Sequence, residues 1–182
     1  MKTKIKVLSA MIVAGAALGS QGAFAIDGTI NFDGLVTAST CTVSSSGGSN
    51  NFTVALPTVA ESALSGANST AGRTPFAITL SGCAASSGNV HTFFESGATT
   101  GASGNLALEG AGSAQNVEIQ LLNQDLSEIK AGYTDAAQNS KAVAIDASGN
   151  ATLNYNAQYI STAGGAVAGE ANSSVAYTIA YQ

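Results

Sequence analysis

The chain has 182 residues, 21 of them glycine and only 2 proline, and charged residues make up 9% of it against about 25% in typical soluble domains. This composition excludes coiled coils and charged helical bundles, and a hydrophobic fraction of 45% excludes an acidic disordered chain. Eleven acidic residues against six basic ones give a net charge of -5, so the chain lacks the cationic surface that binding to nucleic acid requires.

The first 25 residues have the pattern of a secretory signal peptide. Lys2, Lys4 and Lys6 precede an apolar stretch from Val7 to Leu18, and Ala23-Phe24-Ala25 forms a small-x-small cleavage site. A transmembrane anchor would need about 20 apolar residues, more than this stretch provides. We therefore interpret residues 1–25 as a signal peptide that directs the chain out of the cytoplasm.

The segment that follows is expected to be a strand without a place in its own domain. Residues 26–34, Ile26-Asp27-Gly28-Thr29-Ile30-Asn31-Phe32-Asp33-Gly34, alternate apolar or small residues with polar ones, and a second strand-like run from Leu35 to Val43 follows without a turn. Such a segment can add as a strand to the exposed edge of a neighbouring molecule. The alternative is that it folds back as an ordinary edge strand of its own domain.

Two cysteines, Cys41 and Cys83, remain after the predicted cleavage. In an oxidising compartment two thiols of one small domain usually pair, so we expect one disulfide. Closing a loop of about 43 residues would contribute about 4 kcal/mol by restricting the unfolded state.

The remaining chain has the period of two that is typical of β-strands. Val175, Tyr177, Ile179 and Tyr181 alternate with small or polar residues up to the last position. Loops rich in Gly, Ser, Asn and Ala separate the strand-like runs, and a short helix is expected near Thr58 to Leu64. The other predicted strands are Phe52 to Leu56, Phe76 to Leu80, Val90 to Phe94, Val117 to Leu122, Ala142 to Ile145 and Leu153 to Ile160. About seven strands and one disulfide predict an all-β, immunoglobulin-like sandwich.

No signature of an enzyme or a metal site is found. His91 is the only histidine, and no G-x-S-x-G motif surrounds any serine, which argues against a Ser-His-Asp hydrolase. Asp146-Ala147-Ser148-Gly149-Asn150 resembles a fragment of a calcium loop, but its missing ligands and its position between two strands favour a turn. We expect neither catalysis nor a cofactor.

Several of these motifs, in this order, resemble the major pilins of chaperone-usher fimbriae, in particular the type 1 fimbrial subunits. The resemblance covers essentially all of residues 26–182 and includes Gly169 and the penultimate Tyr181. Its other motifs are Gly28 to Gly34, Cys41-Thr42-Val43, Leu80-Ser81-Gly82-Cys83, Asn116 to Leu122 and Tyr155-Asn156-Ala157-Gln158-Tyr159.

The resemblance implies an incomplete immunoglobulin-like β-sandwich, residues 35–182, that is completed by donor-strand exchange. Residues 26–34 would be the donor strand, with Ile26, Gly28, Ile30 and Phe32 pointing into the groove of the next subunit. A periplasmic chaperone would fill the same groove before assembly. The acceptor groove and chaperone-binding site would include Gly169, Val175, Tyr177, Ile179 and Tyr181.

The function expected from this resemblance is that of a structural subunit of the fimbrial rod, on the bacterial surface and reached through the periplasm. Its partners would be identical pilin subunits, the chaperone, an outer-membrane usher, and tip or adaptor subunits, and the fimbria would support adhesion and biofilm formation. The alternatives are a minor or tip adaptor or adhesin subunit, or a secreted monomeric carbohydrate-binding β-sandwich.

Overall fold

The computed structural model describes residues 41–45, 48–84 and 87–182. The predicted signal peptide, residues 1–25, and the predicted donor strand, residues 26–34, lie outside the described residues. Their roles therefore stay predictions from the sequence. The described residues belong to one compact unit that extends to Gln182.

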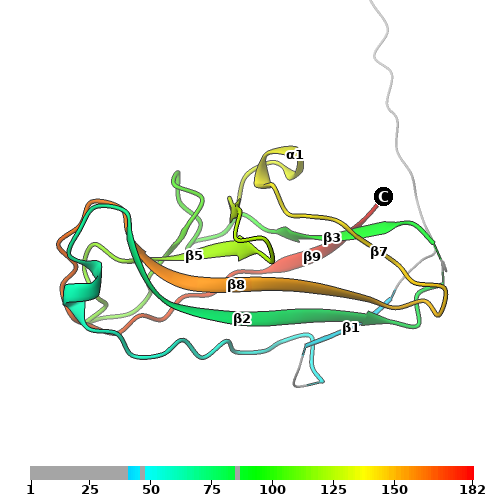
Figure 1. Cartoon of the computed structure of the whole chain (residues 1–182), viewed down its shortest axis with the longest axis horizontal. Coiled ribbons are helices and arrows are strands. Elements are labelled where there is room, and N and C mark those ends of the chain that lie inside the picture. Colours follow the sequence, from blue (N-terminus) through cyan, green and yellow to red (C-terminus); the bar gives the residue numbers. More distant parts are fainter. Residues whose placement is uncertain (1–40, 46–47, 85–86) are drawn as a thin grey trace, which may run out of the picture. The chain divides into compact units, whose positions relative to one another are not determined.

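Two antiparallel sheets form the unit. The larger sheet has six strands in the order β1-β2-β8-β5-β4, with β6 also paired to β5 (Figure 1). Its strands are β1 (Thr42–Ser45), β2 (Ser69–Ser81), β4 (Leu106–Ala107), β5 (Glu118–Asn123), β6 (Glu128–Ile129) and β8 (Ala151–Ser161).

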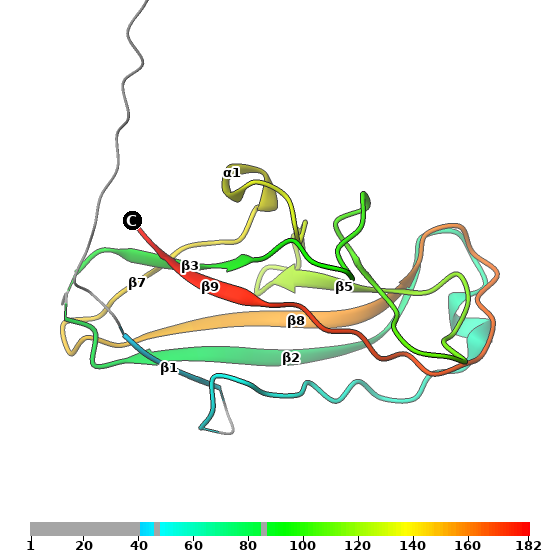
Figure 2. The same ribbon diagram turned by 180° about the vertical axis from the view of Figure 1, so that it is seen from behind.

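The smaller sheet has three strands in the order β7-β3-β9. They are β3 (Asn89–Phe94), β7 (Val143–Ala144) and β9 (Tyr177–Tyr181), and β3 lies between the other two (Figure 2). The last strand of the chain, β9, is therefore an edge strand whose only partner in the described part is β3.

The core lies between the two sheets and follows the alternation of the strands. Leu153, Tyr155 and Ala157 of β8 are buried, and they face the core together with Ile78 and Leu80 of β2. Val90 and Phe94 supply the opposing face from β3. Packing of two antiparallel sheets around such a core is the expected all-β, immunoglobulin-like arrangement.

Two short helices lie outside the sheets. The 3-10 helix η1 (Glu61–Leu64) is within the region where a short helix was expected, whereas the helix α1 (Asp135–Gln138) was not predicted. The side-chain amide of Gln138 accepts a hydrogen bond from the Phe94 N–H and donates one to the Phe94 carbonyl, so it pairs with the last residue of β3 as a strand residue would. Among the described residues no helix has the length and apolar character needed to cross a membrane.

The prediction for the start of β2 was wrong. The sequence predicted this strand over Phe76 to Leu80, with a loop rich in Gly, Ser and Asn before it, but β2 begins at Ser69. The pairing with β8 shifts between Ala71 and Thr74, and Gly72 has a φ of +70° at this point. A bulge with glycine in the left-handed region allows a long strand to continue through a sequence that is typical of a turn.

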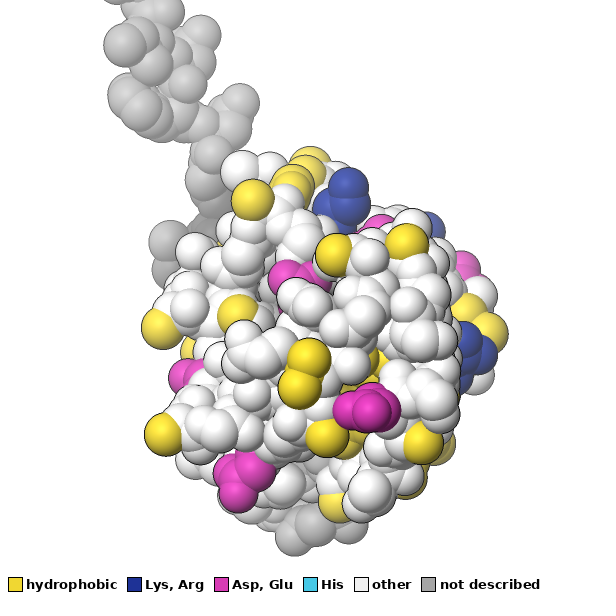
Figure 3. Space-filling model, turned by 90° about the vertical axis from the view of Figure 1, so that its left-hand side faces the viewer, with side chains coloured by type: hydrophobic (Ala, Val, Ile, Leu, Met, Phe, Trp, Pro, Cys, Tyr) yellow, Lys and Arg dark blue, Asp and Glu magenta, His cyan; other side chains and the backbone are white. Residues whose placement is uncertain are grey.

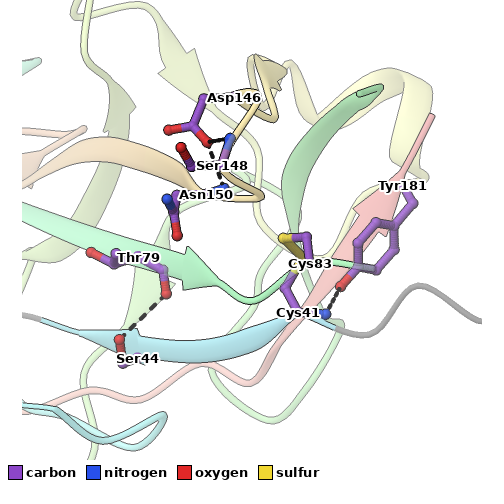
Figure 4. The surroundings of a disulfide bond; sticks show 8 residues. All are labelled: Cys41, Ser44, Thr79, Cys83, Asp146, Ser148, Asn150 and Tyr181. Atoms are coloured by element: carbon purple, nitrogen blue, oxygen red, sulfur yellow. Dashed lines mark hydrogen bonds between the residues drawn. A yellow bond between two sulfur atoms is a disulfide. The ribbon is translucent and has the colours of Figure 1, made fainter. Parts of the chain in front are cut away.

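The segment Asp146 to Asn150 is the turn that the sequence favours. The Asp146 N–H bonds to the Asn150 carbonyl, and the Asp146 side chain accepts hydrogen bonds from the backbone N–H groups of Ser148 and Asn150 (Figure 4). The carboxylate is used to hold the connection between β7 and β8, in the manner of an Asx-turn.

Charged and large apolar side chains are sparse on the part of the surface seen in Figure 3. Asp, Glu, Lys and Arg side chains and apolar side chains lie singly or in small groups among backbone and side chains of other kinds. The large hydrophobic side chains that are exposed in the described part are Leu126 and Val167. Scattered single residues of this kind do not form an interaction patch.

The expected disulfide is present and joins Cys41 to Cys83, 42 residues apart in the sequence. It connects the residue before β1 to the residues that follow β2, at the end of the sheet where these two strands pair (Figure 4).

We predict that replacing both cysteines, Cys41→Ser with Cys83→Ser, lowers the free energy of unfolding by about 2–5 kcal/mol, because the unfolded chain regains the entropy that the loop closure removes. Urea denaturation of the full chain under oxidising conditions measures this change, and periplasmic accumulation should fall with it. Ser44→Ala is the control on the adjoining strand, since it removes only a 3.5 Å contact to the Thr79 carbonyl. An unchanged denaturation midpoint in the cysteine variant would contradict the prediction.

Candidate functional site: an apolar groove beside an open sheet edge

The free edge of β9 presents unpaired backbone groups. Asn89 and Gln182 exchange both of their backbone hydrogen bonds, and Glu95 N–H bonds to the Ala176 carbonyl. Because hydrogen-bonding direction alternates along an antiparallel strand, the even-numbered residues of β9 point their backbone groups toward β3. The N–H and C=O groups of Tyr177, Ile179 and Tyr181 therefore point to the open side, where the described residues provide no strand partner.

A second unpaired backbone lies on the other side of this opening. Residues 52–59 are extended but belong to no ladder, and in the described part none of them makes a backbone–backbone hydrogen bond. The sequence predicted an ordinary strand over Phe52 to Leu56, and the prediction was wrong in that no neighbouring strand pairs with it. Among the described residues, the outer edge of β9 and the backbone of residues 52–59 thus border one gap without a strand partner between them.

An apolar groove of about 590 Å³ occupies the space between these two backbones. One wall is formed by residues 50–54 with Leu56, and the other by residues 173–177 with Ile179. The floor consists of core side chains from both sheets, since the groove opens directly onto the interior of the sandwich. These floor residues are Ile78, Phe94, Leu106, Ile119, Leu121 and Ala157.

The groove has the chemistry of a binding site for an extended apolar segment. No Asp, Glu, Lys, Arg or His is among the described residues that line it. Burial raises the pKa of the Tyr177 phenol above its ordinary value, which reflects the apolar surroundings of this wall. Groups of three or more His, Cys, Asp or Glu residues that could hold a metal ion are not found in residues 41–45, 48–84 and 87–182.

The single histidine has a structural environment. His91 is buried, and its Nε2 lies 2.6 Å from Oδ1 of Asp135 at the start of α1. Its other ring nitrogen lies 3.4 Å from the side-chain nitrogen of Gln182. His91 thus links β3 to α1 and to the last residue of the chain, and it does not line the groove.

The residues predicted for the acceptor site fall in three places. Val175, Tyr177 and Ile179 line the groove, and Tyr181 lies at the disulfide end, where its hydroxyl accepts a hydrogen bond from the Cys41 N–H at 3.2 Å (Figure 4). Gly169 is not among the lining residues. It packs against the backbone of residues 112–114 instead, where a β-carbon would clash with the Ala114 nitrogen and the Gly112 carbonyl oxygen.

The wall formed by residues 50–56 was missing from the predicted site. Its signal in the sequence was the alternation of Phe52, Val54 and Leu56. That alternation predicts a strand with one buried face, but periodicity carries no information on whether the backbone has a partner. The unpaired state of this wall is visible only in the tertiary structure.

Comparison with known proteins identifies relatives of this chain. The FimA family of type-1 fimbrial proteins matches residues 56–182. The F17 fimbrial protein of Escherichia coli is 45% identical over 173 residues, which is 92% of this chain and 94% of that protein. The major fimbrial subunit SMF-1 of Stenotrophomonas maltophilia is 47% identical over 177 residues, covering 93% and 99% of the two chains.

A solved structure shares the fold. The type I fimbria protein and antigen of Burkholderia pseudomallei matches 79% of this chain and 100% of its own with a TM-score of 0.54 and 24% sequence identity. At 24% identity, this match is evidence of a shared fold alone.

The close packing of Gly169 leads to a prediction about stability. Gly169→Ala should lower the free energy of unfolding by about 1–3 kcal/mol, since the added methyl group meets backbone atoms that cannot rotate away. Gly97→Ala is the matched control, because a β-carbon there has no neighbour within 4 Å, and it should change stability by less than about 0.5 kcal/mol. Equal urea midpoints for the two variants would show that the contact of the added methyl group with residues 112–114 does not lower the free energy of unfolding.

Proposed function

The chain belongs to the FimA family of type-1 fimbrial proteins and is a structural subunit of a surface fimbria, and from this premise we propose that it polymerises by donor-strand complementation. In this proposal residues 26–34 of one subunit fill the groove of the next one. The observation that supports it is the apolar groove bordered by the outer edge of β9 and by residues 52–59, neither of which has a strand partner there among the described residues.

A single added strand would satisfy both borders of the groove. It would pair with the outward N–H and C=O groups of Tyr177, Ile179 and Tyr181 on one side and with the backbone of residues 52–59 on the other. Addition of a strand to an exposed edge supplies affinity through backbone hydrogen bonds and specificity through alternate side chains. The apolar floor requires that every second side chain of this strand be hydrophobic or small.

The sequence of residues 26–34 meets this requirement. Ile26, Gly28, Ile30 and Phe32 alternate with Asp27, Thr29, Asn31 and Asp33. Burial of Ile26, Ile30 and Phe32 would supply about 1.5–3 kcal/mol each, in addition to the hydrogen bonds. Gly28 is the one inward position without a side chain.

The geometry of the contact accounts for a filament. The donor of one subunit meets an acceptor at a different place on the next subunit, so the interface is heterologous and leaves a free donor and a free groove at the two ends. Repetition of this contact generates an open rod of identical subunits, and the same groove and donor would join tip or adaptor subunits to the rod.

The groove also defines the expected route to the surface. The predicted signal peptide, residues 1–25, would direct the chain to the periplasm, where an apolar groove without its strand is an aggregation hazard. A periplasmic chaperone that covers Val175, Tyr177 and Ile179 until assembly would remove the hazard, and an outer-membrane usher would then exchange chaperone for donor strand. The assembled fimbria would support adhesion and biofilm formation.

Deleting residues Ile26 to Asp33 tests the proposal. The deleted subunit should keep its groove and bind a synthetic peptide with the sequence of residues 26–34, yet it should not extend filaments, because it cannot donate a strand. Electron microscopy of secreting cells and native electrophoresis with labelled peptide measure the two properties. A peptide with Ile30→Asp and Phe32→Asp is the control and should not bind.

Filaments built from the deletion variant would refute the donor role of this segment. Failure of the unaltered peptide to bind any form of the chain would refute the acceptor role of the groove.

A further inference from the structure

The two walls of the groove touch each other through side chains of β9. The Tyr177 hydroxyl donates a hydrogen bond to the Asn50 carbonyl at 2.7 Å, and both residues line the groove. The Tyr181 hydroxyl accepts one from the Cys41 N–H at 3.2 Å. Residues four apart on a strand lie on the same face about 13 Å from each other, so the second bridge lies beyond the groove, at its disulfide end.

The bridge at Tyr177 includes a second contact across the groove. The Phe52 ring lies edge-on to the Tyr177 ring, with centroids 6.3 Å apart. Phe52 in turn contacts Phe76 at 6.1 Å, and the row of rings continues over the floor through Tyr155 to Phe94. The Tyr177 ring is therefore connected to the aromatic floor through Phe52 of the opposite wall.

A strand that enters the groove needs the space that this bridge crosses. Neighbouring strands lie about 4.8 Å apart, so a strand placed between β9 and residues 50–56 would lie between the Tyr177 backbone and the Asn50 carbonyl. It would also compete for the same carbonyl oxygen, which is one of the acceptors on that wall. The side-chain bridge and the inserted strand therefore exclude each other at this level.

We propose that Tyr177 and Phe52 form a latch that closes the empty groove, and that its opening limits the rate at which a donor strand enters. The latch stabilises the subunit while it has no strand and slows uptake until a strand of sufficient affinity displaces it. This inference rests on the proposed function, since it concerns the same groove.

The two bridges differ in how freely their walls can move. Cys41 is held by the disulfide to Cys83 and precedes β1, which is paired to β2, so the bridge at Tyr181 lies at an anchored end. Residues 52–59 have no backbone partner in the described part, and the wall beside Tyr177 can move without loss of ladder hydrogen bonds. The groove should therefore open at the level of Tyr177 and hinge at the disulfide end.

The test measures the rate at which the full chain takes up a fluorescent peptide with the sequence of residues 26–34, by anisotropy. Tyr177→Phe removes the hydroxyl and keeps the ring, and it should accelerate uptake about three- to tenfold, the range expected for loss of one hydrogen bond. Phe52→Leu removes the ring contact, keeps an apolar wall, and should also accelerate uptake.

Two further variants serve as controls. Tyr133→Phe loses a hydroxyl bond of the same length, 2.7 Å to the Ala102 carbonyl, at a place that does not line the groove, and it should leave the rate unchanged. Tyr181→Phe, at the anchored end, should accelerate uptake less than Tyr177→Phe does.

The possible results distinguish an error in the latch proposal from an error in the proposed function on which it rests. If the wild-type chain takes up the peptide and neither Tyr177→Phe nor Phe52→Leu is faster, the latch is wrong and donor-strand uptake stands. If Tyr181→Phe is as fast as Tyr177→Phe, the hinge at the disulfide end is wrong. If the wild-type chain takes up no peptide, the proposed function and the latch both fail.

Discussion

The unpaired backbone along β9 is the constraint from which the other features of this subunit follow. Outward N–H and C=O groups of Tyr177 and Ile179 border an apolar groove, and those of Tyr181 continue the open edge toward the disulfide end. Residues 52–59 border the groove from the opposite side, with no ladder of their own among the described residues. Backbone polar groups next to apolar surface need a partner, and an exposed edge of this kind invites one from another chain. In the proposed assembly, the donor strand of another subunit would be that partner.

The rest of the molecule holds the two borders at a suitable separation. The Cys41–Cys83 disulfide and the pairing of β1 with β2 fix one end of the first wall to the larger sheet. The floor of core residues, among them Ile78 and Leu121, belongs to β2 and β5, which are both paired to the long strand β8. The paired strands of the sandwich thus carry the groove floor, while the wall at residues 52–59 makes no backbone–backbone hydrogen bond within the described part of the chain.

The difference between the paired floor and the unpaired wall connects the stability of the single subunit with its proposed assembly. The aromatic contacts of Phe52 and the hydroxyl bridge of Tyr177 give the empty subunit a partial substitute for the absent strand. In the proposed assembly a donor strand would add a ladder of backbone hydrogen bonds and several buried side chains in place of these two side chains, which would favour the assembled state. A structural protein whose filaments must persist gains from such a difference between its free and its assembled state.

The sequence by itself determined the all-β class, the strands β3, β5, β8 and β9 from their alternation, the disulfide from the compartment and the cysteine count, and the turn at Asp146. These features are local or compositional, and alternation reports the buried face of a strand directly. Only the tertiary structure decided which backbones lack a partner. The run Phe52 to Leu56 has the same period as a paired strand, Gly169 packs against residues 112–114 away from the groove, and the amide of Gln138 replaces a strand residue beside Phe94. Hydrogen-bond partners, bulges and side-chain bridges such as Tyr177 to Asn50 join residues far apart in the chain, and no local pattern specifies them.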